Sequence, residues 1–170
     1  MRKILFVVFL LLLVGCEKQD VINTTLEPGF DVITVGDNWE YSGCILSLND
    51  EQTYNMAIKE NNIANSELGE YEVIYEKEFR EEVYTCTRIV KVVDDIAPLV
   101  TLNTGIDTVV VGKEWIDSFV TATDNFDLEL TITVVGEVDS DTVGRYIVVY
   151  EVIDDLLNKT TVTRIVNIVE

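Results

Sequence analysis

The sequence repeats itself, and this internal repeat restricts the possible folds more than any other feature. Shifted by 76 residues, Thr25–Cys44 is identical to Thr101–Val120 at eight of twenty positions, far more than unrelated segments share. The second halves of the two copies match as well, with about one residue of slippage. The chain therefore contains two copies of one domain, called below the first repeat (20–94) and the second repeat (95–170).

Both repeats are predicted to be β structure. In Leu68–Glu76, Tyr, Val and Tyr alternate with Glu, Ile and Glu, which is typical of a half-buried strand. Leu130–Val135 and Thr160–Val169 are rich in Val, Ile and Thr, which favour strands. No helical pattern follows residue 20. Six or seven short strands per repeat, separated by Gly, Asn and Asp turns, predict an all-β chain of two tandem immunoglobulin-like β-sandwich domains.

Two aromatic positions recur in both repeats. The phrase Gly-x-Tyr, which ends at Tyr71 and again at Tyr146, resembles the tyrosine corner of Ig-like sandwiches and implies a structural role. Trp39 and Trp115 share one repeat position. We expect them to pack in the core or at a sheet edge, although an exposed tryptophan would also suit carbohydrate stacking.

The N-terminus has the pattern of an export signal. Two basic residues precede the apolar run Ile4–Val14, which is shorter than the roughly 20 residues that span a bilayer. The run ends in Leu-Val-Gly-Cys, which resembles the bacterial lipobox and implies a diacylglyceryl group on Cys16 and cleavage before it. We predict a signal peptide at 1–15 and a lipidated cysteine with its tether at 16–19. The alternative is an ordinary secretory signal with an incidental cysteine.

Charge limits the partners. The chain has 12 Lys and Arg against 31 Asp and Glu, a net charge of −19. This excludes nucleic acid, whose binders need a basic surface. Anionic headgroups would repel such a surface as well. We therefore expect an exported protein, lipid-anchored in the cell membrane or an outer membrane, on the extracytoplasmic side. Its predicted partners are the membrane, through Cys16, and another envelope or extracellular protein.

The second repeat resembles a known family, the bacterial surface Ig-like repeat of pesticidal crystal proteins, a relative of the hyalin repeat. The matching segments are Asp95–Pro98, Gly112, Ala122–Asn125, Gly144–Tyr150 and Arg164–Val166. The resemblance implies a spacer, stalk or adhesive module without enzymatic activity. The first repeat departs from it, with Leu46–Asn49 at the Ala-x-Asp position and Phe79 and Arg80 in place of Asp154 and Asp155.

Cys44 and Cys86 form an even pair in a protein predicted to be exported. They align with Val120 and Val162 of the second repeat, and both positions are expected to point inward. We predict a disulfide, with two buried free thiols as the alternative. Because valines fill the same space in the second repeat, the bond would be an addition to the fold.

Aspartates cluster in the predicted turns and the junction of the second repeat. The candidates for calcium ligands are Asp94, Asp95, Asp124, Asp154 and Asp155, with Asp127 close by. Calcium prefers such oxygen-rich loops, but no EF-hand spacing occurs. The alternative is that these residues are solvated turn acids. We expect no cofactor, with calcium as the one candidate ion.

Arg88 and Arg164 share a strand face with inward-pointing valines. Each is expected to form a structural ion pair at the end of the core, with Asp124 as a candidate partner in the second repeat. A structural role is favoured over a binding site.

No catalytic pattern is present. The sequence has no histidine, which removes the usual general base and the commonest zinc ligand. It contains no P-loop or G-x-S-x-G motif. The leading hypothesis is a non-enzymatic, membrane-anchored surface lipoprotein that acts as a protein-interaction or spacer module. The alternatives are a carbohydrate- or calcium-dependent adhesin module and, third, a degenerate carboxylate hydrolase.

Overall fold

The structure of the chain, a computed structural model, describes residues 19–126 and 129–170. These residues form strands and turns, so the prediction of an all-β fold is confirmed. None of the described residues belongs to a helix long and apolar enough to cross a membrane. The predicted signal peptide, the lipidation site Cys16 and the turn residue Asp127 lie outside the described residues.

The first repeat forms two sheets, with strand orders β1-β3-β4 and β2-β7-β6-β5. Its strands are β1 (Ile22–Leu26), β2 (Val32–Thr34), β3 (Cys44–Leu48), β4 (Gln52–Asn55), β5 (Ala57–Asn61), β6 (Gly69–Phe79) and β7 (Glu82–Val93). Long β6 and β7 form an antiparallel hairpin, and short β2 lies parallel to the end of β7.

The second repeat has a similar plan, with strand orders β8-β10 and β9-β13-β12-β11. Its strands are β8 (Leu99–Leu102), β9 (Thr108–Val110), β10 (Val120–Thr123), β11 (Thr131–Val135), β12 (Gly144–Ile153) and β13 (Lys159–Val169). Here β9 lies parallel to β13, as β2 does to β7. The same sequence pattern therefore produces the same order in the four-stranded sheet twice, while the smaller sheet has three strands in the first repeat and two in the described part of the second.

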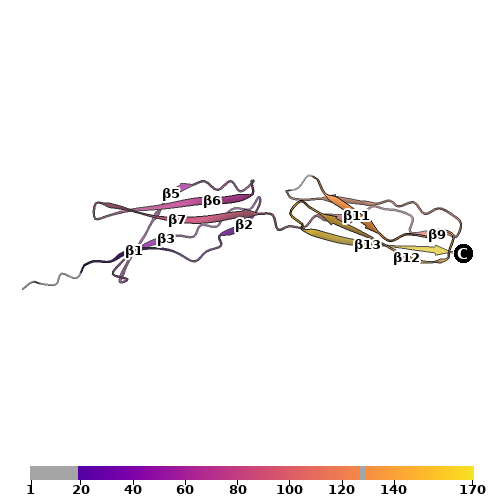
Figure 1. Cartoon of the computed structure of the whole chain (residues 1–170), viewed down its shortest axis with the longest axis horizontal. Coiled ribbons are helices and arrows are strands. Elements are labelled where there is room, and N and C mark those ends of the chain that lie inside the picture. The colour runs from indigo at the N-terminus through magenta and orange to yellow at the C-terminus, as the bar shows by residue number, and fades with distance from the viewer. Residues whose placement is uncertain (1–18, 127–128) are drawn as a thin grey trace, which may run out of the picture.

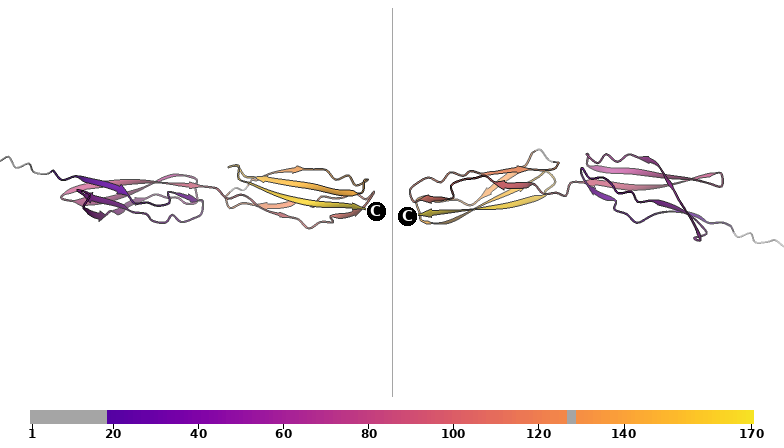
Figure 2. Two further views of the ribbon diagram at one scale, coloured as in Figure 1. Left: turned by 90° about the horizontal axis from the view of Figure 1, so that it is seen from below. Right: turned by 180° about the vertical axis from the view of Figure 1, so that it is seen from behind.

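The two sets of sheets lie end to end and are joined by one connection between β7 and β8 (Figures 1 and 2). Strand pairing stays within each set. The predicted boundary between residues 94 and 95 falls in this connection and stays a prediction. The first described residues and the C-terminus lie at opposite ends of the molecule (Figure 1).

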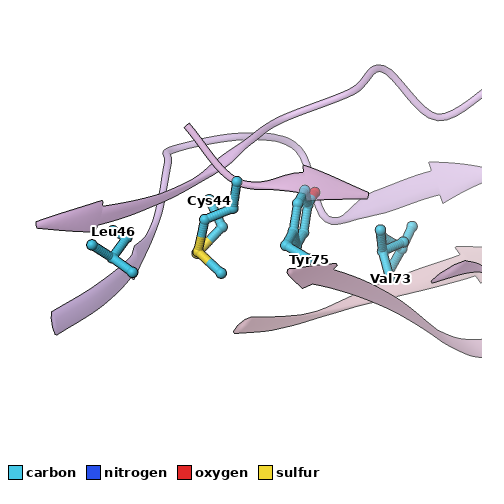
Figure 3. Close-up of a cluster of buried hydrophobic side chains, with 6 residues drawn as sticks. Cys44, Leu46, Val73 and Tyr75 are labelled. Atoms are coloured by element: carbon cyan, nitrogen blue, oxygen red, sulfur yellow. The ribbon is translucent and has the colours of Figure 1, made fainter. Parts of the chain in front are cut away.

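The core of the first repeat lies between its two sheets. Burial alternates along β6, where Val73 and Tyr75 are fully buried between more exposed neighbours. These side chains meet Cys44 and Leu46 of β3 (Figure 3). The period of two in the sequence therefore sets which face of the sheet becomes core.

A disulfide joins the two sheets of the first repeat. Cys44 on β3 is bonded to Cys86 on β7, with their Cα atoms 6.6 Å apart. The predicted bond is confirmed. In the second repeat Val120 is buried and Val162 packs against the same cluster, so valines take the place of the cystine there.

Candidate functional site

Three aspartates meet where the second repeat faces the connection. Asp94 follows β7, Asp124 follows β10 and Asp154 follows β12. Each places one carboxylate oxygen within 4.8 Å of those of the other two. Asp94 is 7% exposed and Asp154 is 4% exposed, while Asp124 is half-buried. We call these three residues the carboxylate cluster.

Tight turns hold the carboxylate cluster in place. In each turn the backbone N–H two residues further along donates to the aspartate, at 3.2 Å for Asp94 and 2.9 Å for Asp124 and Asp154. The Asn158 side chain then links two members. Its Nδ2 donates to Asp154 Oδ2 at 2.8 Å and to the backbone oxygen of Asp94 at 3.3 Å. The sequence-based prediction did not include Asn158.

The other two aspartates proposed as ligands are outside the carboxylate cluster. Asp95 is exposed, and its Oδ1 accepts a hydrogen bond from Thr34 Oγ1 of the first repeat at 2.7 Å. Asp155 is exposed too. The structure therefore brings together three of the five candidate ligands, and a role of Asp95 and Asp155 in binding calcium stays a prediction.

Arg164 is buried and paired, but not with the expected residue. Its Nη1 donates to Asp107 at 2.9 Å, and its Nη2 donates to the backbone oxygens of Asn103 and Phe119 at 2.7 and 3.1 Å. Asp124 was therefore the wrong partner. It follows the end of β10 and belongs to the carboxylate cluster, whereas Arg164 binds the backbone at Phe119, just before the start of β10. Arg164, on β13, therefore binds the loop backbone at Asn103 and Phe119 to the four-stranded sheet.

The first repeat has an equivalent ion pair. Arg88 Nη1 donates to Asp31 at 2.5 Å, and Nη2 donates to the backbone oxygens of Glu27 and Gly43. Burial acts to lower the pKa of Arg88, but the hydrogen bond and charge of Asp31, together with Tyr75, raise it overall. Sequence reasoning missed Asp31 and its counterpart Asp107, although their identity at one repeat position was a usable signal.

A buried tyrosine accompanies each arginine. Tyr150 donates its hydroxyl to Asp117 Oδ1 at 2.5 Å, and Tyr75 donates to the backbone oxygen of Ser42. Burial, together with the bond to Asp117, raises the pKa of Tyr150 to about 12. Burial raises the pKa of Tyr75 as well. These phenols therefore stay neutral and act as structural donors.

The recurring aromatic residues have structural contacts. The hydroxyls of Tyr71 and Tyr146 donate to the backbone oxygen four residues upstream, at 2.9 and 2.8 Å, the geometry of a tyrosine corner. Trp39 and Trp115 are half-buried and pack against the cores of their repeats. Trp39 Nε1 also donates to the backbone oxygen of Phe30 at 2.9 Å.

An apolar groove lies beside β9. Its volume is about 690 Å³, and its lining includes Ile106, Val110 and Ile116. Ile106 is 76% exposed and Ile116 is 75% exposed. Strand β9 lies next to the C-terminus, at the end of the molecule furthest from the first described residues (Figure 1). No pattern in the sequence predicted this groove.

A comparison with protein families identifies the second repeat. Residues 100–168 match the family described as "Bacterial surface protein, Ig-like domain". The second repeat carries a bacterial surface Ig-like domain. Such a domain suggests a protein-interaction module at the cell surface, in agreement with the resemblance seen in the sequence. No curated protein matches the chain.

Proposed function

We propose that this chain is a lipid-anchored surface protein without enzymatic activity, which binds another protein of the envelope or its surroundings. The bacterial surface Ig-like domain supports the location and the interaction role. The Leu-Val-Gly-Cys sequence ending at Cys16 supports the anchor. The lack of histidine in the sequence supports a non-enzymatic role, because it removes the usual general base.

The groove beside β9 is the observation that carries the binding role. Ile106 and Ile116 leave most of their side-chain surface in water. Contiguous exposed apolar surface on a soluble domain marks an interaction site, and apolar contacts form the core of protein interfaces. A chain anchored at Cys16 would present the groove at the end away from the membrane.

The chemistry of the groove and the charge of the chain define the partner. The groove accepts an apolar side chain, and Lys113 and Glu114 also line it. Because the chain carries a net charge of −19, a partner with basic residues around that apolar anchor would associate fastest. We therefore propose a protein ligand with an apolar anchor in a basic setting.

Capture from envelope extracts tests this role by comparing three forms of the full-length chain. Ile116→Glu places a charge in the groove, whereas Val83→Glu makes the same change at a 61% exposed residue of the first repeat. We expect a basic protein to be retained equally by the unmodified chain and by Val83→Glu, and about tenfold less by Ile116→Glu. Equal retention by all three forms would refute the groove as the binding site.

Carbohydrate binding is the second candidate function, and one hollow favours it. Trp39 lines a small hollow of about 250 Å³ in the first repeat together with Asn38, Asn61 and Asn65. Amides that bond to hydroxyls beside an aromatic ring suit a sugar. Glycan-array binding that is lost with Asn61→Ala and retained with the Trp115→Phe variant of the second repeat would support it. An array without signal would reject it.

A further inference from the structure

The carboxylate cluster brings two buried carboxylates close together, with a third that is half-buried. Two of its members, Asp94 and Asp154, are at least nine-tenths buried. None of the ion pairs among the described residues joins either one to a lysine or arginine. We propose that Asp94, Asp124 and Asp154 bind one calcium ion, which fastens the end of β7 to the second repeat.

Asp94 gives independent evidence for a ligand. Its side chain reaches into the carboxylate cluster, and its Oδ1 accepts the backbone N–H of Ile96. Its Oδ2 is buried and has no hydrogen-bond partner among the described residues. A buried carboxylate oxygen without a donor is costly, because it has lost its water and gained nothing in return. A bound cation would supply the missing interaction.

The ligand atoms favour a hard cation. Each member of the carboxylate cluster contributes a carboxylate oxygen, and the sequence contains no histidine. Cys44 and Cys86 are bonded to each other in the disulfide and offer no thiolate to a metal ion. Oxygen ligands alone select calcium or magnesium over zinc. Two oxygens on one calcium ion lie up to about 5 Å apart, given Ca–O distances of about 2.5 Å, so separations within 4.8 Å suit calcium.

Two of the three proposed ligands, Asp124 and Asp154, have no acidic counterpart in the first repeat. In the first repeat, Leu46–Asn49 occupies the position of Ala122–Asn125, which contains Asp124, and Phe79 and Arg80 replace Asp154 and Asp155. One calcium ion per chain is therefore expected. The turns that hold each carboxylate are formed already, so binding needs little rearrangement of the backbone.

An ion at this place would stiffen the junction between the repeats. Asp94 directly follows β7, whereas Asp124 and Asp154 belong to turns of the second repeat. Among the described residues, the Asn158 side chain joins these two sides of the cluster through its bond to the backbone oxygen of Asp94. Calcium would add three carboxylate contacts across it. The consequence is a chain that stands straighter with calcium than without it.

Equilibrium dialysis of the chelator-treated, full-length chain in detergent against ⁴⁵Ca²⁺ tests the proposal. We expect close to one calcium ion per chain, lost in both Asp124→Asn and Asp154→Asn. Asp141→Asn, which makes the same charge change at an exposed turn acid of the second repeat, should retain the ion. Calcium should also slow hydrogen exchange in peptides covering residues 94–98 and 154–158, and leave those covering β5 unchanged.

Three results would overturn the proposal. The first is the absence of retained calcium in the unmodified chain at millimolar concentration, a measurement that needs no variant. The second is a full complement of calcium in Asp124→Asn and Asp154→Asn variants whose circular dichroism matches the unmodified chain. The third is displacement of calcium by an equal concentration of magnesium, which would refute the assignment to calcium.

Discussion

Arg164 donates to both carboxylate oxygens of Asp107, at 2.9 and 3.1 Å, although 57 positions separate the two residues in the sequence. The arginine side chain is 2% exposed, while that of Asp107 is 39% exposed. The ion pair therefore lies at the edge of the core, with the Arg164 guanidinium buried and the Asp107 carboxylate in contact with solvent. A matching pair, Arg88 and Asp31, does the same in the first repeat.

Removing Asp107 should destabilise the second repeat. Asp107→Ala removes the two carboxylate hydrogen bonds of the buried guanidinium and leaves it with backbone oxygens and with Asp117, 3.9 Å from its Nε, so the free energy of unfolding should fall by about 2–3 kcal/mol. Chemical denaturation measures this change. Asp141→Ala, which removes an exposed acid of the same repeat, should change stability by about 0.5 kcal/mol or less. Equal effects of the two substitutions would show that the ion pair does not stabilise the fold.

The disulfide should stabilise the first repeat without being needed for its fold. Cys44 and Cys86 are 42 positions apart, and closing a loop of that size contributes about 4 kcal/mol in the chain-entropy model. We expect the double variant Cys44→Val/Cys86→Val to keep its circular dichroism spectrum and lose about that much stability. The second repeat, with Val120 and Val162, shows that valines fit this space. A double variant that fails to fold would contradict the prediction.

High pH should unfold the second repeat through Tyr150. In the fold its pKa is about 12, against an ordinary value of 10.0. Because this pKa is raised in the fold, the neutral phenol of Tyr150 stabilises the folded state fully below pH 10. That contribution, about 2–3 kcal/mol, is lost as the pH rises to about 12. Tyr150→Phe should show a shallower decline of stability over this range, measured by urea unfolding. Parallel declines of the two proteins would refute the role of Tyr150.

The lipid anchor is predicted from sequence alone and needs a test in cells. Replacing the thiol, as in Cys16→Ser, removes the only atom to which the diacylglyceryl group is proposed to attach. We expect labelled palmitate to be incorporated into the unmodified chain and not into the variant. Cys44→Ser should keep the label, since Cys44 is buried in the first repeat. Label in Cys16→Ser would contradict the lipobox interpretation.

Sequence periodicity predicted the strands well, because alternation along a strand directly sets which side chains are buried. Tyr75 and Tyr150 are fully buried at equivalent places for this reason. The cystine was predictable too, since Cys44 and Cys86 align with valines that point inward. These inferences depend on local pattern and on the repeat, both of which are visible in one sequence.

Pairings between loops were less predictable, because they depend on where loops meet in space. Asp107 was visible as a repeated aspartate, yet nothing local linked it to Arg164. Near the junction, Asp94 is buried and its neighbour Asp95 is exposed, because the course of the backbone turns their side chains in different directions. The groove beside β9 was missed for a similar reason: Ile106 is apolar, and composition alone assigns such a residue to a core.

Photo-crosslinking in intact cells tests the central claim most directly. A photoreactive amino acid at position 116 lies in the groove, and one at position 83 lies at an exposed site of the first repeat. The account predicts a crosslink to one envelope or extracellular protein from position 116 and none to that protein from position 83. It also predicts that Ile106→Glu abolishes the crosslink. The same products from both positions, unaffected by Ile106→Glu, would contradict the claim that the groove binds a protein partner.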